Sequence, residues 1–371
     1  MMRYLVTITD NISPTSMPYN EIVLYRRRHY PDEKQIVILL FKTNINRYAS
    51  VPEDLKIHCV GKSLKKLNNI VGSLLEKASQ EKIGLLFHIH EAKSIIFFAL
   101  ATKGRYRDHI IYTLHSTYAH YALHNKLMSA LASFLSGKIV CVGQTAYRSY
   151  PALLKKLLGN KVVSIRNGVD CERIDAVLQS MQENHTDEKD GLELIYIARL
   201  MPLKRHDILF QALRNLPQVK LFLMGEGTHR KALESLAKEY DVSDRVHFLG
   251  LTPRDGVFRE ILKHDVYVSS SSYEGLPISL LEAMSCEVVC AASNIAQHRE
   301  VQEICPSLIL VDNTPEDWVK AIHRIASMKK EEKKQIAAQN KRDVDRYFSL
   351  DQMHEQYDRV YEELMDRIVK R

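Results

Sequence analysis

The alternation of strand-like and helix-like segments constrains the fold of this chain more than any other feature, because it restarts once. In the first half the expected buried strands are YLVTI, QIVILLF, LKIHCV, GLLFHIH, HIIYTL, KIVCVG and KVVSI. In the second half they are LELIYIA, VKLFLMG, RVHFLG, DVYVSS, EVVCAA and LILV. Strands that alternate with amphipathic helices form a mainly parallel sheet with helices on both faces. The pattern therefore predicts an α/β protein made of two doubly wound domains in tandem, with a crevice between them.

The length of 371 residues is sufficient for two domains that each have their own core. We expect the first domain at residues 1–170, the second at residues 171–348 and a final helical segment at residues 349–371, with Ser349 as the N-cap of the last helix. The polar stretch from Glu183 to Gly191 is the best candidate for an interdomain linker. Helical patterns also cover Lys65 to Gln80 and Thr145 to Leu158.

Composition favours a cytosolic protein. The longest apolar stretch, around Ile95 to Ala101, is far too short to span a bilayer, and the first ten residues fit a strand better than a signal peptide. Six cysteines, none of them in a Cys-x-x-Cys pair, indicate reduced thiols.

The formal charge is distributed unevenly. Through Asp170 the chain has 24 basic and 11 acidic residues, or +13, and the remainder has 28 basic and 34 acidic residues, or −6. A basic first half suits an anionic lipid leaflet or a phosphate-bearing acceptor. Nucleic acid is the least favoured partner, since no binding motif accompanies the charge. An ordinary solvated basic surface remains an equal alternative.

Two acidic residues, Glu274 and Glu282, flank the start of an expected helix in SSSSYEGLPISLLEAM. Glu274 follows the strand DVYVSS, and Pro277 suits the first turn of the next helix. In an open α/β sheet, ligands bind at the carboxyl ends of the strands. The pair could therefore accept hydrogen bonds from vicinal hydroxyls, although acids near a helix N-terminus can also simply complement its dipole.

Two cations occupy the corresponding position after the strand LELIYIA. Arg199 and Lys204 precede a helix, whose free backbone N–H groups would help them bind a diphosphate. The alternative is a pair of surface charges. Gly225 and Gly227 end the next strand and permit close backbone approach, or form a plain turn.

Sixteen histidines allow several interpretations. His88 with His90 on one strand face, or His120 with His124 one helical turn apart, could hold a metal, but no further ligands at fitting spacing accompany them. His115 ends the strand HIIYTL and faces the crevice, so it is the histidine that we favour for function, against a packed or loop histidine. The chain has no nucleophile elbow, P-loop or Gly-x-Gly-x-x-Gly fingerprint, which disfavours a hydrolase, a P-loop ATPase and a dinucleotide dehydrogenase.

Taken in order, the segments IRNGVD, IARLMPLKRHD, LMGEGTHRKALESLAKEY, RVHFLG and SSSYEGLPISLLEAMSCEVV resemble the second domain of retaining glycosyltransferases of family 4. The similarity covers roughly residues 161–305. It implies the GT-B fold, in which two doubly wound Rossmann-like domains face a central cleft. It also implies that the last helix crosses back to the first, acceptor-side domain.

The resemblance implies roles in binding a nucleotide-sugar donor. Arg199 and Lys204 would neutralise its diphosphate, which is the leaving group. Glu282 would hold the nucleotide ribose, and the backbone around Phe248 and Leu249 would lie near the base. On this account no metal or other cofactor is required.

For the transferred sugar, the resemblance assigns Glu274 together with the backbone of Gly275, Leu276 and Pro277. His115 would approach the sugar from the first domain. Such enzymes retain the anomeric configuration by front-face attack, in which a donor phosphate oxygen takes the acceptor proton. Positioning and electrostatics would supply most of the acceleration.

Two segments depart from the family pattern. The loop from Asp10 to Met17 lacks the usual glycines, and Asn294 to Glu300 replaces a glycine pair that often precedes the last acidic residue of the site. Neither change affects the four charged donor residues, so we expect an active enzyme.

The expected function is transfer of a hexose or N-acetylhexosamine, from a UDP-sugar by preference, to a glycan or lipid-linked acceptor in cell-surface polysaccharide synthesis. The expected location is the cytoplasm, peripheral to the inner face of the membrane. The alternatives are transfer to a small soluble acceptor and a sugar-nucleotide-binding protein without turnover.

Overall fold

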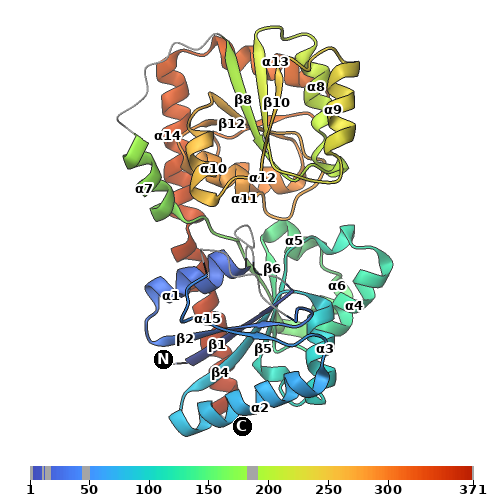
Figure 1. Ribbon diagram of the computed structural model, residues 1–371, viewed down its shortest axis with the longest axis vertical. Coiled ribbons are helices and arrows are strands. Elements are labelled where there is room, and N and C mark those ends of the chain that lie inside the picture. Colours follow the sequence, from blue (N-terminus) through green and yellow to red (C-terminus); the bar gives the residue numbers. More distant parts are fainter. Residues whose placement is uncertain (1–2, 11, 13–17, 44–50, 182–190, 370–371) are drawn as a thin grey trace. The chain divides into compact units, whose positions relative to one another are not determined.

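The computed structural model describes residues 3–10, 12, 18–43, 51–181 and 191–369. The chain forms two compact units: the first contains residues 1–167 and 353–371, and the second contains residues 168–352 (Figure 1). Of the expected linker, Glu183 to Asp190 lies outside the described residues. The first passage between the two units falls at Asn167 and Gly168.

The first unit contains a sheet of seven parallel strands in the order β3-β2-β1-β4-β5-β6-β7. Their bounds are β1 Arg3–Thr9, β2 Glu33–Leu39, β3 Lys56–Cys59, β4 Gly84–Ile89, β5 Ile110–Leu114, β6 Lys138–Val142 and β7 Val162–Ile165. Every residue of β1 is buried, as expected for a parallel strand covered on both faces. Because β1 pairs with β2 on one side and β4 on the other, the strand order reverses at this point.

Helices cover both faces of this sheet. They are α1 Tyr25–His29, α2 Leu64–Glu81, α3 Ala92–Thr102, α4 Leu123–Phe134, α5 Gln144–Ser149, α6 Ala152–Leu158 and the part of α15 (Leu350–Val369) that begins at Met353. The helix expected from Thr145 to Leu158 is divided into α5 and α6. Pro151 has no N–H to donate, and Tyr150 before it is extended with ψ 132°.

The second unit contains six parallel strands in the order β10-β9-β8-β11-β12-β13. Their bounds are β8 Leu192–Ile197, β9 Val219–Met224, β10 Val246–Gly250, β11 Val266–Ser269, β12 Val289–Ser293 and β13 Ile309–Val311. Each of the thirteen expected strands is present, and the predicted pair of doubly wound α/β domains is confirmed.

The helices of the second unit pack against two hydrophobic clusters, one of which includes the fully buried Trp318. They are α7 Cys171–Met181, α8 His206–Leu213, α9 Arg230–Glu239, α10 Arg254–Ile261, α11 Ile278–Ser285, α12 Ala296–Gln302, α13 Pro315–Ser327 and α14 Lys330–Tyr347. The hydroxyl of Ser349 accepts a hydrogen bond from the N–H of Gln352 at 3.3 Å, as predicted for the N-cap of α15. No helix among the described residues is long and apolar enough to cross a membrane.

Candidate active site

Three of the four predicted charged residues of the second unit, Arg199, Lys204 and Glu274, lie in the connections that follow its strands, and the fourth, Glu282, lies on α11. β8 pairs with β9 on one side and β11 on the other, so the strand order reverses between β8 and β11. Helices on opposite faces separate at such a point and leave room for a ligand at the carboxyl ends. Lys204 lies in the connection after β8, and Glu274 lies in the connection after β11.

Lys204 and Glu274 form an ion pair. The Nζ of Lys204 lies 2.6 Å from Oε1 of Glu274, and the two side chains are 15% and 14% exposed. The limited exposure strengthens the attraction between the two charges. The structure thus brings together a cation assigned to diphosphate and a carboxylate assigned to sugar.

The loops that carry this pair are joined by hydroxyl groups. Ser271 donates to Oε1 of Glu274 at 2.6 Å, and the hydroxyls of Tyr196 and Ser271 lie 2.7 Å apart. The carbonyl of Lys204 accepts from the hydroxyls of Tyr196 and Ser270, each at 3.1 Å. These bonds fix the position of Glu274. Tyr196 and Ser271 were not singled out from the sequence, although the serine run before Glu274 was visible there.

Glu282 on α11 is 5% exposed and forms an ion pair with Arg254, the first residue of α10. Burial raises the pKa of Glu282, and the charges of Arg254 and Arg173 oppose the rise. The arrangement presents a carboxylate that a neighbouring guanidinium holds in place. Sequence reasoning missed Arg254, because nothing in the sequence relates the start of α10 to α11.

The remaining predicted donor residues are placed as follows. Arg199 is exposed and forms no ion pair with another described residue. Leu276 is 7% exposed in the core beneath the Glu274 loop, and the carbonyl of Pro277 accepts bonds from the first turn of α11. Gly275 and Leu249 are half-buried, the latter near the end of β10.

Gly225 and Gly227 allow close approach to protein backbone. A Cβ atom at Gly225 would lie 2.0 Å from the carbonyl oxygen of Ala198, and one at Gly227 would lie 2.2 Å from that of Leu200. Gly225 also has φ +143°, which side chains rarely permit. The two glycines therefore pack the loop after β9 against the loop that leads to Lys204.

His115 follows β5 in the first unit. Its Nε2 lies 2.9 Å from Nδ1 of His90, which follows β4, and burial lowers the pKa of His115 to about 4. At neutral pH the imidazole is thus uncharged, so one ring nitrogen donates a hydrogen bond and the other accepts one. The structure gives His115 a fixed position at the carboxyl edge of the first sheet.

The alternative of a metal at His88 and His90 does not fit the structure. Both ring nitrogens of His88 have partners, the hydroxyl of Tyr361 at 2.9 Å and that of Thr113 at 2.8 Å. His120 similarly contacts the hydroxyl of Thr117 at 2.9 Å. Within the described ranges, no group of three or more His, Cys, Asp or Glu residues could hold a metal ion.

Glu91, which the sequence analysis did not consider, lies at the strand-order switch of the first sheet. Its carboxylate accepts from the hydroxyls of Thr9 at 3.3 Å and Ser94 at 3.2 Å. Burial, with the charge of Asp10, raises the pKa of Glu91 to about 7. Its position directly after the strand GLLFHIH was the available signal. Residues 11 and 13–17 of the neighbouring glycine-poor loop lie outside the described residues.

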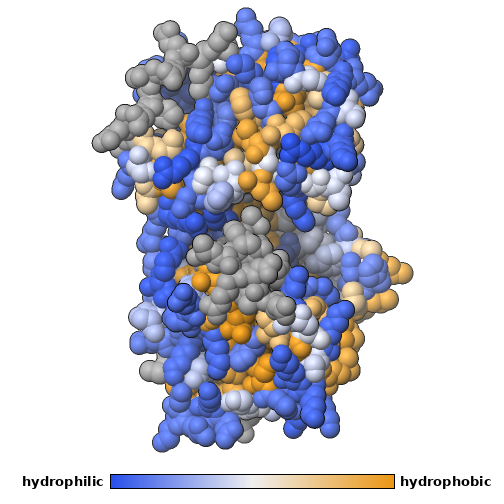
Figure 2. All heavy atoms as spheres, viewed as in Figure 1, coloured by the Kyte–Doolittle hydropathy of each residue, from blue (hydrophilic) through white to orange (hydrophobic). Residues whose placement is uncertain are grey.

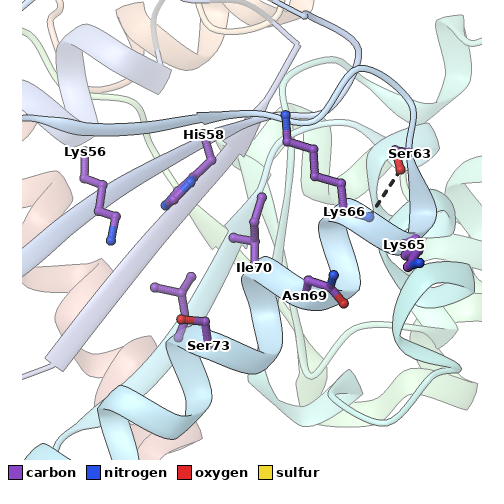
Figure 3. A pocket seen from close by; sticks show the side chains of 9 residues that line it. Lys56, His58, Ser63, Lys65, Lys66, Asn69, Ile70 and Ser73 are labelled. Carbon is purple, nitrogen blue, oxygen red and sulfur yellow. Dashed lines mark hydrogen bonds between the residues drawn. The ribbon is translucent and has the colours of Figure 1, made fainter.

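A separate hollow of about 430 Å³ lies in the first unit between β3 and α2. Lys56 and His58 extend into it from the strand, and Lys66, Ile70 and other residues of α2 form its opposite wall (Figure 3). Burial and the nearby lysines lower the pKa of His58. None of the predicted site residues lines this hollow.

Two protein-family models match the chain in tandem. Residues 35–173 match Glycosyltransferase Family 4, and residues 177–343 match Glycosyl transferases group 1. The two matches together span most of the chain, and each falls mainly on one half of it.

Individual relatives agree with the family models. The chain is 26% identical over 269 residues to the phosphatidylinositol N-acetylglucosaminyltransferase protein of Arabidopsis thaliana, covering 70% of this chain and 57% of the plant protein. It is 30% identical over 125 residues to the O-antigen biosynthesis glycosyltransferase WbnH of Escherichia coli, covering 34% of this chain and 35% of WbnH. The chain thus matches about half or less of these proteins' lengths.

Among solved structures, HepE from Anabaena in complex with UDP and glucose has a similar fold. The TM-score is 0.74 at 18% sequence identity, and the match covers 96% of this chain and 99% of that one.

Proposed function

Because the chain belongs to the GT4-type glycosyltransferases, we propose that it transfers a hexose or N-acetylhexosamine from a UDP-sugar to a glycan or lipid-linked acceptor, with retention of anomeric configuration. One observation carries the proposal. Lys204 and Glu274, a cation for a diphosphate and a carboxylate for hydroxyl groups, are paired at the strand-order switch of the second unit.

The donor would bind with its diphosphate at Lys204 and Arg199. Lys204 would then exchange the carboxylate of Glu274 for phosphate oxygens, which frees Glu274 to accept hydrogen bonds from the sugar. Ser271 holds that carboxylate in place during the exchange. Glu282 would accept hydrogen bonds from the ribose, and Leu249 would lie near the base. The backbone of Gly275, Leu276 and Pro277 would complete the sugar contacts.

In the transfer step the bond from the anomeric carbon to the donor phosphate breaks, and the acceptor oxygen bonds to the same face of that carbon. The leaving phosphate oxygen takes the acceptor proton, so the protein need not supply a nucleophile or a base. Lys204 would stabilise the negative charge that develops on the leaving diphosphate. Stabilisation of such charge by a fixed cation is usually the largest single contribution to the rate. Uncharged His115 would hydrogen-bond the sugar from the first unit. No metal is assigned to these steps.

The comparisons support particular choices of donor and acceptor. HepE was solved with UDP and glucose, and the plant relative is named for N-acetylglucosamine transfer. WbnH is named for O-antigen biosynthesis. We therefore favour UDP-N-acetylglucosamine or UDP-glucose as the donor and a lipid-linked acceptor at the inner face of the cytoplasmic membrane.

A donor screen followed by nuclear magnetic resonance tests this proposal. UDP-, GDP- and ADP-sugars are first ranked by the thermal shift that each produces, since a ligand of the folded state raises stability. The preferred donor is then incubated with enzyme while the anomeric protons are recorded. We expect a UDP-sugar to rank first and the α-configured donor to release the α-anomer first. Release of the β-anomer first would refute retention, and binding without donor consumption would indicate a protein that only binds sugar nucleotides.

A further inference from the structure

Helix α4 in the first unit has its apolar side exposed. Leu123, Leu127 and Leu131 recur every four residues and are 74%, 65% and 49% exposed, and Phe134 is 43% exposed. A surface helix ordinarily buries such a stripe against the core. In α4 the apolar stripe faces the solvent instead of the core.

The opposite side of α4 is small and polar, and it is anchored in the core. Ser129, Ala132 and Ser133 are buried. The hydroxyl of Ser129 lies 3.2 Å from that of Tyr112, and Ser133 accepts from the hydroxyl of Tyr150 at 2.5 Å. These hydrogen bonds fix the rotation of α4 about its own axis. If the leucines turned inward, the buried hydroxyl groups would lose their hydrogen-bond partners.

Helix α6, which packs against α4, extends the apolar surface. Leu153 and Leu157 are 68% and 62% exposed, one helical turn apart. Together, the leucine patch consists of Leu123, Leu127, Leu131, Phe134, Leu153 and Leu157. Figure 2 shows apolar side chains gathered at the edge of the first unit where α4 and α6 lie. Contiguous exposed apolar surface of this kind marks an interaction site.

The charge around the leucine patch has one sign. No aspartate or glutamate occurs between Asp108 and Asp170, whereas that segment has seven lysines and arginines. Three of them, Lys126, Arg148 and Lys156, lie on α4, α5 and α6. Within the part of the chain that the structure describes, none of these three forms an ion pair with a carboxylate.

We propose that the leucine patch docks the protein on a lipid membrane that contains anionic lipids. Leucines that enter the boundary between headgroups and acyl chains, with cations beside them, are the combination that binds an anionic leaflet. A second copy of this chain fits less well, because symmetric contact would bring the cations of this acid-free segment against each other. The inference deepens the proposed function, since a membrane is where a lipid-linked acceptor is found.

Sedimentation with vesicles tests the docking surface without any donor or acceptor. The vesicles contain phosphatidylcholine alone or mixed in equal amounts with phosphatidylglycerol. We expect wild-type protein to bind the mixed vesicles at least about tenfold more strongly, and added salt to weaken this binding. Changing both Leu127→Asp and Leu157→Asp should lower binding at least about tenfold, because each change removes an apolar contact and adds a repelled charge.

The matched control is Leu64→Asp, which alters an exposed leucine of α2 outside the patch and should bind as wild type does. Thermal unfolding of each variant verifies that it folds. In Leu127→Trp the new indole emission should shift to shorter wavelength with mixed vesicles, while the native Trp318 is fully buried and stays constant. Equal binding to both vesicles, or wild-type binding by the double variant, would overturn the proposal. A wild-type dimer that the double variant converts to monomer would assign the patch to self-association instead.

Because these measurements need no sugar nucleotide, their failure would leave the proposed transfer reaction intact. Conversely, absence of donor turnover would not affect the membrane proposal.

Discussion

At the scale of single residues, the pairing of Lys204 with Glu274 determines how the site can respond to a ligand. The distance of 2.6 Å and the low but non-zero exposure of both side chains describe a close, largely buried ion pair. A diphosphate would compete with Glu274 for the lysine, so donor binding and release of the carboxylate would occur together. This coupling makes Lys204 the most informative residue to change.

We predict that Lys204→Ala lowers turnover of the preferred UDP-sugar by about 100- to 1,000-fold, as expected when one fixed charge is removed from a developing leaving group. Initial rates of donor consumption at saturating donor measure the effect. Lys330→Ala, which alters an exposed lysine at the start of α14, serves as the control. Turnover by the Lys204 variant within a factor of about two of wild type would show that Lys204 does not stabilise the leaving group.

Substitution of Arg254 should lower the free energy of unfolding by an amount that depends on pH. Arg254→Ala leaves the carboxylate of Glu282 buried without its counter-ion, which costs about 3 kcal/mol of unfolding free energy when the carboxylate is charged. Burial already raises the pKa of Glu282. A raised pKa stabilises the fold at low pH, and this stabilisation is lost as pH rises through the folded value.

The loss of stability relative to wild type should therefore be larger at pH 8 than at pH 5. Urea unfolding at both values provides the measurement. A loss that is equal at the two values, or larger at pH 5, would show that Arg254 does not stabilise the charge of Glu282.

At the scale of elements, the packing of the β9 loop against the β8 loop positions Lys204. We predict that Gly227→Ala lowers the unfolding free energy by about 1–3 kcal/mol, because its Cβ would lie 2.2 Å from the carbonyl of Leu200 and the backbone must shift. The affinity for UDP should fall as well. Gly72→Ala on α2 is the control, since nothing lies within 4 Å of its added Cβ. If the two alanine variants had equal stability and UDP affinity, the close packing of these loops would be unimportant.

The secondary-structure elements were more predictable from the sequence than the contacts between them. Parallel strands buried on both faces are short, continuous apolar runs, so all thirteen were recognisable. The break between α5 and α6 was missed, although Pro151 was a visible signal for it. Lys204 and Glu274 were singled out because each lies in the connection between a strand and the next helix. Arg254 and Tyr196 were not, because their roles depend on contacts between segments that are distant in the sequence.

At the scale of the whole molecule, buried histidines make stability sensitive to acid. Burial lowers the pKa values of His115 and His206 to about 4 and that of His354 to about 3, and it holds those of His88 and His90 well below the usual range. Unfolded histidines take up protons near pH 6.5, whereas these remain neutral in the folded state. Stability is therefore present above pH 6.5 and is lost as the pH falls towards the folded values.

We predict that each such histidine removes up to about 1.4 kcal/mol of unfolding free energy per pH unit below pH 6.5. The raised pKa values of Glu91 and Glu282 act in the opposite direction, but these two carboxyl groups are fewer than the buried histidines. Urea unfolding midpoints at pH 7.5 and 5.5 should therefore decrease clearly with acidification. Replacing the exposed His124 by glutamine should leave the trend unchanged. A midpoint that is constant or higher at pH 5.5 would contradict the burial of neutral imidazoles.

Across the whole chain, the second unit carries the residues that we assign to the donor, and the first unit carries His115 and the leucine patch. We infer that the second unit binds the nucleotide of a UDP-sugar through Lys204. Calorimetric titration of UDP tests it most directly, because it requires neither the sugar nor the acceptor. We expect saturable binding to wild type, equal binding to Lys330→Ala and at least about tenfold weaker binding to Lys204→Ala. No binding of UDP to the folded wild-type protein, or equal affinity in the Lys204 variant, would contradict it.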